Sequence, residues 1–572
     1  MNIFESYLKK IISLIKKNQK KLDLRETNSF KGVILEVPPL NIGSDLSCNI
    51  CMILAKPNNL DPNKLAVKIR ELIMKHISDF KDVKIAKPGF LNISFSNEAF
   101  SHIINNIFLE DNKFGSLKTN YNYNIEFVSA NPTGPMHIGH CRGAVFGDVL
   151  SNLLKFNGNK VTKEYYINDY GAQINSFVKS VYLRIREIKY KEKFSNEKDL
   201  YPGEYIIDIA KKVLDKSKLK FNSFEESYDF LEKESLHYSM KMIKLDLEKL
   251  GILHDSFVSE KSIVKSDTLE KALEKLKKTK HVEEGFLEPP KGEEVNNWKK
   301  TKKLIFKSVL FGDDTNRALQ KNDGSWTYFA NDLAYHSNKV LRKYDKLINV
   351  LGADHTGYVK RIKGAVQALS ENQTILECKV CQLVKLFKNG SPFKMSKRAG
   401  DFISVKDLLN EVNRDSIRFM MLNRSNDVEL EFDFDKVLEK NKDNPVFYVQ
   451  YCHARIKSIF RLLNFKIEKK RQLKIKSINF NKYEKDILKK IFEWPNIISV
   501  SSNKHEPHRI PFYLYELATL FHSYWSKGNE NEKYKFIKDG RANESVMIII
   551  QLILIVLQNG MNILDVSLPD QM

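Results

Sequence analysis

Cysteine is scarce in this 572-residue chain. The six are Cys48, Cys51, Cys141, Cys378, Cys381 and Cys452. Cysteines this sparse and scattered exclude a disulfide framework at this length, and they fit a reducing compartment, so we expect a cytoplasmic protein. Cys48 with Cys51 and Cys378 with Cys381 have the C-x-x-C spacing that can supply four thiolates to zinc. Because the pairs lie far apart in the chain and neither has a glycine-rich knuckle, zinc binding is the weaker alternative, and we expect no metal ligands.

Long hydrophobic runs are also lacking. The most apolar stretch, Val546 to Leu557, is about 12 residues and contains Gln551, whereas roughly 20 apolar residues are needed to span a bilayer. The N-terminal stretch MNIFESYLKKIISLIKK has helical spacing of apolar residues, and lysines interrupt any signal-peptide core. We therefore expect an opening helix of a domain and no membrane anchor.

Acidic residues are outnumbered by basic ones. Lys and Arg total 93 against 71 Asp and Glu, which gives a net charge of +22. Such a field favours an anionic partner, with nucleic acid as the first candidate. The alternative is a compositional bias, because Lys, Ile and Asn are abundant throughout the chain. Hydrophobic residues make up 42% of the sequence, which excludes a disordered polymer.

The sequence patterns predict a multidomain protein. The expected divisions are an α+β domain at residues 1–115, an α/β domain at 116–405 with a helical insertion at about 180–300, a connecting segment at 406–440 and a helical bundle at 441–572. In the second division NIEFVSA (124–130) is an apolar strand that passes through a Gly/Pro turn into a helical pattern. This order is the opening of a nucleotide-binding sheet of Rossmann type. Stretches starting at Leu304, Thr327 and Leu347 predict a return to strands, and no convincing strand follows Phe434.

The first chemical motif is SANPTGPMHIGH, from Ser129 to His140. His137 and His140 are three residues apart, so both lie on one face of the first helical turn, where backbone N–H groups and the helix dipole favour phosphate. Gly139 leaves room for an adenine ring or for close backbone approach. The alternative interpretation is a pair of satisfied histidines at a helix start.

The second motif is SPFKMSKRAG, from Ser391 to Gly400. Lys394 and Lys397 lie on a short stretch between a proline and a glycine, where they can neutralise the charge of a pyrophosphate leaving group. A lysine-bearing surface loop is the alternative, and in so basic a chain the K-x-x-K pattern alone would favour it.

Together, the two motifs resemble in order, context and spacing the paired signatures of class I aminoacyl-tRNA synthetases. Within that class the sequence resembles the arginyl-tRNA synthetases. The segments that carry this resemblance are ANPTGPMHIGH (130–140), YYINDYGAQI (165–174), YPGEYI (201–206), WTYFANDLAYH (326–336), LGADHTGY (351–358), FKMSKRAG (393–400) and NPVFYVQYCHARI (444–456). The resemblance implies a ligase that activates L-arginine with ATP and transfers it to the terminal adenosine of tRNA(Arg).

The resemblance also implies site residues. The catalytic residues implied are His137, His140, Lys394 and Lys397. The ATP-binding residues implied are Asn131, Pro132, Thr133, Gly134, Pro135, Met136, Ile138, Gly139, Gly352, Asp354, Met395 and Ser396, with His140 as a further adenosine contact. The arginine-binding residues implied are Glu126, Ser129, Asn131, Tyr328, Asp332 and His355. Mg²⁺ is expected to accompany ATP and to be held by phosphates and water, so no protein ligand is predicted.

Residue chemistry supports part of this arginine site independently. A guanidinium needs planar carboxylate partners. Tyr328 and Asp332 are four residues apart and can project from one helical face. The alternatives are that Asp332 caps a helix and that Glu126 is a satisfied acid at a strand end.

The C-terminal region carries a basic and aromatic pattern that suits RNA loops. Residues 455–490 contain 13 Lys and Arg against 3 Asp and Glu, with Phe460, Phe465, Phe480 and Tyr483 interleaved. The expected tRNA-binding residues are Arg455, Lys469, Lys470, Arg471, Lys474 and Lys476. A solvated helical face is the alternative. Residues 1–115 resemble the family's added N-terminal domain, which implies contact with the tRNA elbow.

Three other functions fit parts of the sequence. A synthetase for another amino acid would share both motifs but lack the acidic pair for a guanidinium. A nucleotidyltransferase acting on small metabolites would not need a basic helical bundle, and a non-catalytic RNA-binding relative would not need both motifs intact. We therefore expect an arginine–tRNA ligase with no membrane or DNA partner.

Overall fold

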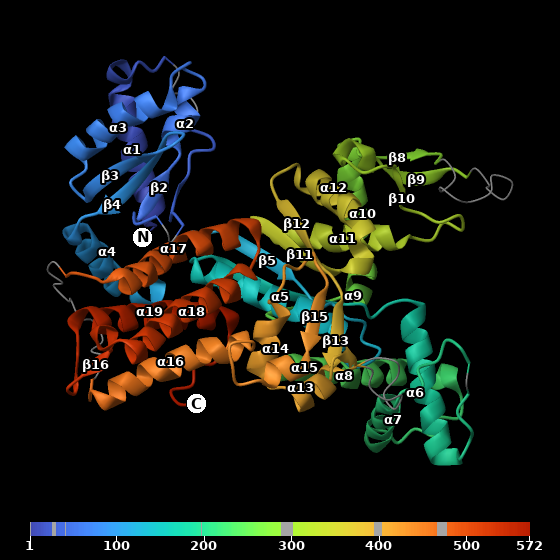
Figure 1. The fold of residues 1–572 in the computed structure, drawn as a ribbon. Helices are drawn as coiled ribbons and strands as arrows, with labels where there is room; N and C mark the ends of the chain where they lie inside the picture. The colour runs from blue at the N-terminus through green and yellow to red at the C-terminus, as the bar shows by residue number, and fades with distance from the viewer. Residues whose placement is uncertain are drawn as a thin grey trace. The chain divides into compact units, whose positions relative to one another are not determined.

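The computed structural model describes residues 2–25, 30–39, 42–195, 197–287, 301–393, 403–465 and 478–572. The chain forms two compact units. One comprises Met1–Leu117 and Glu439–Met572, and the other comprises Lys118–Leu438 (Figure 1).

The unit formed by Lys118–Leu438 is built on a five-stranded parallel sheet with the order β12-β11-β5-β6-β7 (Figure 1). Its strands are β5 (Asn122–Glu126), β6 (Lys160–Ile167), β7 (Ser256–Ser259), β11 (Lys346–Gly352) and β12 (Ile375–Cys381). The chain adds β6 and β7 on one side of β5 and then adds β11 and β12 on the other side. In such doubly wound sheets the crevice for a ligand lies where the order reverses, at the carboxyl ends of the strands. The expected Rossmann-type fold is confirmed.

Helices connect and cover this sheet. They are α5 (Ile138–Phe156), α6 (Ala172–Tyr190), α7 (Glu204–Lys216), α8 (Phe224–Lys249), α9 (Glu260–Val264), α10 (Thr268–Lys278), α11 (Tyr328–Leu341), α12 (Val359–Ser370), α13 (Val405–Glu411), α14 (Arg414–Met421) and α15 (Phe434–Leu438). α6, α7 and α8 share an apolar core that includes Phe177, Ile206 and Leu231, so the expected helical insertion forms between β6 and β7. Two short strands, β7 and β8, follow these helices within the range of about 180–300 that was expected to be helical.

Smaller sheets complete this unit. Their strands are β8 (Val282–Gly285), β9 (Lys303–Phe306), β10 (Arg317–Ala318), β13 (Val384–Lys388), β14 (Ser391–Pro392) and β15 (Leu430–Asp433).

The strand expected from Thr327 is wrong, because Thr327 is the N-cap of α11 and its side chain accepts a hydrogen bond from Ala330 N–H at 3.3 Å. The β-forming residues Tyr328 and Phe329 are overridden by this cap and by the buried face of the helix.

The other unit contains an antiparallel sheet with the order β1-β2-β4-β3 and a set of long helices. Its elements are α1 (Ile3–Lys17), β1 (Leu35–Glu36), β2 (Leu46–Cys48), α2 (Ile50–Ala55), α3 (Pro62–His76), β3 (Phe80–Ala86), β4 (Phe90–Phe95), α4 (Asn97–Glu110), α16 (Pro445–Leu462), α17 (Lys482–Lys504), α18 (Arg509–Glu530), β16 (Ile537–Lys538), β17 (Arg541–Ala542) and α19 (Glu544–Leu564). The expectation of no strand after Phe434 is wrong at β16 and β17. Asp539 and Gly540 have φ of 51° and 72°, the backbone that a tight hairpin turn requires.

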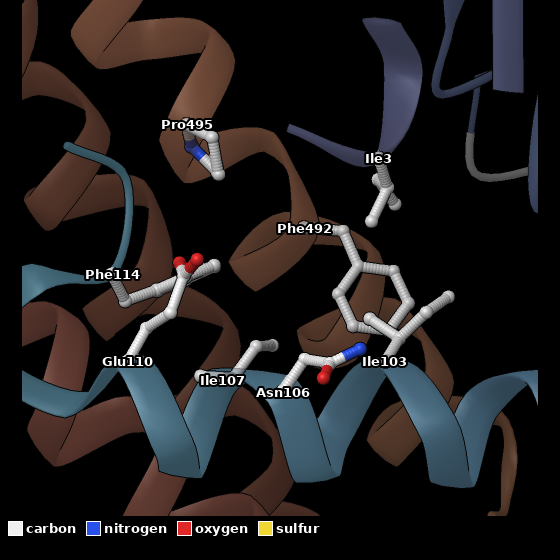
Figure 2. Close-up of a pocket in the computed structure, with 8 residues that line it drawn as sticks. All are labelled: Ile3, Ile103, Asn106, Ile107, Glu110, Phe114, Phe492 and Pro495. Carbon is white, nitrogen blue, oxygen red and sulfur yellow. The ribbon is translucent and has the colours of Figure 1, made fainter. Parts of the chain in front are cut away.

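A small cavity marks where α1, α4 and α17 pack together (Figure 2). Ile3, Ile103, Ile107 and Phe492 line it, and its volume is only about 10 Å³, which is about the room for one water molecule. This junction is therefore a packed core and not a ligand pocket.

α19 is the helix in the described part of the chain that is long and apolar enough to cross a membrane by length and composition, with 21 residues. The expectation that this stretch is too short is wrong, because the helix continues past the apolar run to Leu564. Of its most apolar window, 78% is buried inside the protein, and α16, α17, α18 and α4 pack against it.

A buried ion cluster ties α5, β6 and α14 together. Asp148 is 1% exposed, and its carboxylate lies 2.6 Å from Lys163 Nζ and 2.5 Å from Arg418 Nη2. Arg418 also donates to the carbonyl of Leu250 at 2.9 Å. This cluster stabilises the unit only while positive and negative charges stay matched.

We predict that Asp148→Asn lowers the free energy of unfolding by about 3–5 kcal/mol, because it leaves two cations buried without their carboxylate. Chemical denaturation followed by circular dichroism measures this change. The matched control is Glu429→Gln, which removes an exposed ion pair to Lys385 and should cost less than about 1 kcal/mol. Equal losses in the two variants would contradict the importance of burial.

Candidate active site

The carboxyl end of β5 forms one wall of the site. The strand ends at Glu126 and does not run to Ala130 as expected, because Val128 and Ser129 have φ of 71° and 40°. These left-handed values are uncommon for residues other than glycine and are strained for a β-branched residue such as Val128. Ser129 Oγ accepts from Tyr166 N–H at 3.1 Å and donates to Glu126 Oε1 at 3.2 Å, so β6 holds the turn in place.

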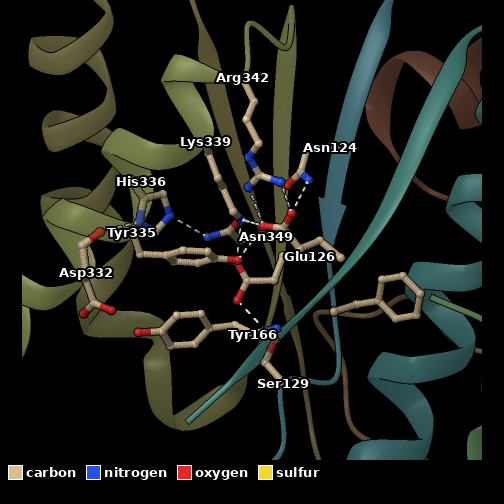
Figure 3. A network of polar contacts seen from close by, with 12 residues as sticks. Asn124, Glu126, Ser129, Tyr166, Asp332, Tyr335, His336, Lys339, Arg342 and Asn349 are labelled. Carbon is tan, nitrogen blue, oxygen red and sulfur yellow. Dashed lines mark hydrogen bonds and ion pairs between the residues drawn. The ribbon is translucent and has the colours of Figure 1, made fainter. Parts of the chain in front are cut away.

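Helix α11 forms the facing wall. Asp332, Tyr335, His336 and Lys339 recur at spacings of three and four residues, so they project from one side of the helix toward β5 and β11 (Figure 3). Asp332 does not cap a helix, since Thr327 is the N-cap of α11.

These walls enclose a cavity of about 450 Å³. All six residues expected to bind arginine line it, namely Glu126, Ser129, Asn131, Tyr328, Asp332 and His355. Other polar lining residues are Tyr166, Asn168, Gln173, Glu260, Tyr335, His336, Asn349 and Tyr358. The cavity lies at the carboxyl ends of β5 and β11, where the strand order reverses.

Two carboxylates in this cavity have no ion-pair partner among the residues that the structure describes. Burial, together with nearby Glu260 and Glu126, raises the pKa of Asp332 to about 7, against the opposing effects of Arg361 and of the Tyr358 hydroxyl, which donates to Asp332 Oδ2. Burial also raises the pKa of Glu260 to about 7, with Asp169 adding to the effect. A bound cation would offset the cost of ionising both groups.

Glu126 is in a different electrostatic position (Figure 3). Its Oε2 lies 2.5 Å from Lys339 Nζ and 3.0 Å from the Tyr335 hydroxyl, whose single proton has a shorter contact, at 2.7 Å, to Glu164 Oε1. The alternative that Glu126 is a satisfied strand-end acid therefore holds for one of its two oxygens. Oε1 accepts only from Ser129 among these groups and keeps capacity for a donor from a ligand.

The two motif histidines lie at the start of α5, with ring centroids 3.8 Å apart. His137 is the N-cap, and its Nδ1 accepts from Gly139 N–H at 3.1 Å, while His140 Nδ1 accepts from His137 N–H at 3.4 Å. Each ring therefore carries its proton on Nε2. Burial lowers the pKa of His137 and lowers that of His140 to about 4, so both are neutral hydrogen-bond donors at pH 7.

The other residues expected to bind ATP are differently placed. Asn131 and Gly352 line the cavity, whereas Pro132, Thr133, Gly134, Pro135, Ile138, Gly139 and Asp354 do not. A side chain at Gly139 would lie 2.9 Å from the His137 ring, so this glycine makes room for the capping histidine. Met136 is fully buried, and its carbonyl accepts from Val405 N–H at 2.9 Å. Lys394, Met395, Ser396 and Lys397 lie outside the described residues.

The RNA-binding expectation is only partly covered by the structure. Arg455 lies on α16, where its guanidinium is 4.4 Å from the Tyr451 ring centroid and donates to the Tyr451 hydroxyl at 2.6 Å. Lys469, Lys470, Arg471, Lys474 and Lys476 lie outside the described residues.

The six cysteines are free thiols. Cys48 and Cys51 lie in one unit and Cys378 and Cys381 in the other. Burial raises the pKa of Cys48 to about 11 and of Cys381 to about 12. No cluster of three or more metal-ligating side chains was found in the described ranges.

Sequence reasoning missed residues that the geometry singles out, among them Glu260 and Arg142. Glu260 directly follows β7, and the position after a parallel strand would have indicated it had that strand been expected. Arg142 lies one turn into α5, and its buried guanidinium donates to the carbonyls of Gln382, Val428 and Ser425 at 2.9, 2.7 and 2.7 Å. It thus ties the histidine helix to the β13–β15 region, and no local sequence pattern reveals that contact.

Family models match nearly the whole chain. The class I (R) tRNA synthetase catalytic domain matches residues 103–460, the arginyl-tRNA synthetase N-terminal domain matches 9–95, and the DALR anticodon-binding domain matches 449–572. The N-terminal and C-terminal matches fall within residues 1–115 and 441–572, the two regions that the sequence pattern separates from the α/β domain.

Curated relatives and solved structures agree with these matches. The arginine–tRNA ligases of Pelagibacter ubique and of the Wolbachia of Brugia malayi are 50% and 42% identical, each over 100% of both chains. The arginyl-tRNA synthetase of Thermus thermophilus shares the fold at a TM-score of 0.68, with 17% identity over 99% of this chain and 100% of that one. That of Plasmodium falciparum shares it at 0.71, with 16% identity over 99% of each chain. The chain belongs to the arginyl-tRNA synthetase family of class I aminoacyl-tRNA synthetases.

Proposed function

We propose that the cavity between β5, β11 and α11 is the arginine site of an arginine–tRNA ligase. The observation that carries the proposal is a pair of carboxylates, Asp332 and Glu260, that line the cavity without an ion-pair partner among the described residues, and whose pKa values burial raises to about 7. A guanidinium is a planar cation with paired donors, which matches two carboxylates better than an ammonium does. Tyr328, Asn131, Ser129, His355 and Glu126 supply further polar contacts to the substrate.

The reaction proceeds in two displacements. A carboxylate oxygen of arginine attacks the α-phosphorus of ATP in line, and pyrophosphate leaves with the electron pair of the broken P–O bond. The 2′-hydroxyl of the terminal adenosine of tRNA(Arg) then attacks the carbonyl carbon of the arginyl-adenylate, and AMP leaves. No covalent intermediate with the enzyme is required.

His137 and His140 act on the phosphates as neutral donors. Their Nε2–H groups lie at the N-terminus of α5, where the helix dipole also favours developing negative charge. Lys394 and Lys397 neutralise the pyrophosphate, and Met395, Ser396, Gly139, Gly352 and Asp354 contact the adenosine. Mg²⁺ enters with ATP and is held by phosphate oxygens and water.

The remaining parts of the chain bind RNA. Residues 441–572 take the anticodon region, using Arg455 and the lysines and arginine of 469–476, and residues 1–115 contact the tRNA elbow. The excess of positive charge supports this assignment. The protein acts in the cytoplasm without a membrane or DNA partner.

Asp332→Asn should lower kcat/KM for arginine by roughly 30-fold to several-thousand-fold, because it removes one charged partner of the guanidinium while keeping the side-chain size. The KM for ATP should barely change. Steady-state aminoacylation measures both constants. The control is Asp267→Asn, an exposed acid before α10, which should leave all constants unchanged. Near wild-type efficiency of Asp332→Asn would place the guanidinium elsewhere.

The KM for arginine should depend on pH around neutrality. Because Asp332 and Glu260 have pKa values of about 7 in the free protein, they become protonated as the pH falls below 7, and arginine must then displace a proton to bind. For one proton, KM should rise about tenfold between pH 8 and pH 6. Aminoacylation at saturating ATP and tRNA measures this. A KM that stays constant over this range would refute the role of the carboxylates.

Lys397→Ala should lower kcat for adenylation by roughly 100-fold or more and change the KM for arginine little, since the lysine acts on charge that develops in the transition state. ATP–pyrophosphate exchange in the presence of tRNA measures the effect. Lys385→Ala, which removes an exposed lysine of β13, is the control. Weaker ATP binding with unchanged kcat would contradict the role.

A further inference from the structure

A lysine lies beneath the proposed arginine pocket, where a positive charge should oppose the binding of a cation. Lys339 belongs to α11 and its side chain is 0% exposed. Its Nζ lies 2.5 Å from Glu126 Oε2 and 3.1 Å from Asn349 Oδ1 (Figure 3). Both partners line the cavity, whereas Lys339 does not.

We propose that Lys339 is a positioning residue that sets the charge of the pocket. It neutralises and orients Glu126, so that discrimination for the guanidinium charge depends on Asp332 and Glu260. This inference rests on the proposed assignment of the cavity as the arginine site.

The charges of the buried network support a dedicated pairing. Glu164 is bound by both terminal nitrogens of Arg342, one of them at 2.9 Å, and by Asn124 Nδ2 at 3.1 Å. Lys339 Nζ lies 3.9 Å from Glu164 but 2.5 Å from Glu126. Two carboxylates therefore face two cations, with Arg342 matched to Glu164 and Lys339 matched to Glu126. A buried network of this kind tolerates no unpaired charge.

The contacts of Lys339 also orient polar side chains on β5, β11 and α11 around the cavity. Because Lys339 binds Oε2 of Glu126, Oε1 remains the oxygen that Ser129 contacts and that a substrate can reach. Lys339 binds Asn349 Oδ1, so the amide nitrogen of Asn349 donates to His336 Nε2 at 3.0 Å. His336 Nδ1–H then donates to the backbone carbonyl of Asp332 at 2.8 Å.

This arrangement has a signature that a purely structural lysine lacks. Replacing Glu126 by Gln removes the carboxylate nearest to Lys339. Glu164, 3.9 Å away, is already paired with Arg342, so one positive charge is left in excess beneath the pocket, where it repels the guanidinium. Like charges a few ångströms apart at a partly buried site weaken binding on the order of 100-fold. Removing the ammonium in the same background should restore much of the affinity, although the double variant has lost more native contacts.

The test is a double-mutant cycle of Glu126→Gln, Lys339→Met and both together, with the KM for arginine measured in aminoacylation by the full-length protein. Glu126→Gln should raise the KM on the order of 100-fold, and the double variant should recover at least about tenfold of that loss. The KM for ATP should stay within about threefold throughout. Citrulline, a neutral analogue of arginine, should inhibit Glu126→Gln and the double variant equally.

A double variant whose KM for arginine equals or exceeds that of Glu126→Gln would overturn the proposal and make Lys339 merely structural. Circular dichroism and thermal melting show whether each variant folds. If the double variant does not fold, Glu126→Gln combined with Lys339→Gln takes its place, and its KM for arginine is compared with that of Glu126→Gln in the same way. Asp332→Asn separates the two claims, because a normal KM in that variant refutes the arginine site itself.

Discussion

The proposed site depends on an excess of negative charge inside its cavity. Asp332 and Glu260 face one cavity without matched cations in the described part of the chain, and burial raises the pKa of each to about 7. A folded protein normally pairs such groups or leaves them exposed. In the proposed function the guanidinium of arginine supplies the missing positive charge, and pairing with it offsets the cost of ionising the two carboxylates.

Several neighbouring charges of the scaffold are paired. Glu126 faces Lys339, Glu164 faces Arg342, and on α5 Asp148 lies between Lys163 and Arg418. The strained turn at Val128 and Ser129 also shapes the site, because the end of the strand allows Glu126 and Asn131 to reach the cavity. At the start of α5, burial lowers the pKa of His137 and of His140, which keeps both rings neutral, and in the proposed mechanism they donate hydrogen bonds to the phosphates.

The sequence predicted the Rossmann-type sheet, the helix after the first motif and the six residues that line the cavity. It could do so because short motifs lie at strand ends, where local pattern and chemistry coincide. It missed Glu260, since a four-residue strand within a lysine-rich helical stretch has no clear alternation. It also missed Lys339 and Arg142, whose partners are 213 and up to 286 residues away in the chain. At Thr327, local β propensity was misleading because capping and packing decided the helix.

Proton release on binding tests the central claim most directly. Isothermal titration of the full-length protein with arginine at pH 7, in buffers of different ionisation enthalpy, counts the protons that leave the complex. With two carboxylates near half-protonation before binding and ionised afterwards, the account predicts release of about one proton per arginine. A heat of binding independent of the buffer, and so no proton released, would contradict it.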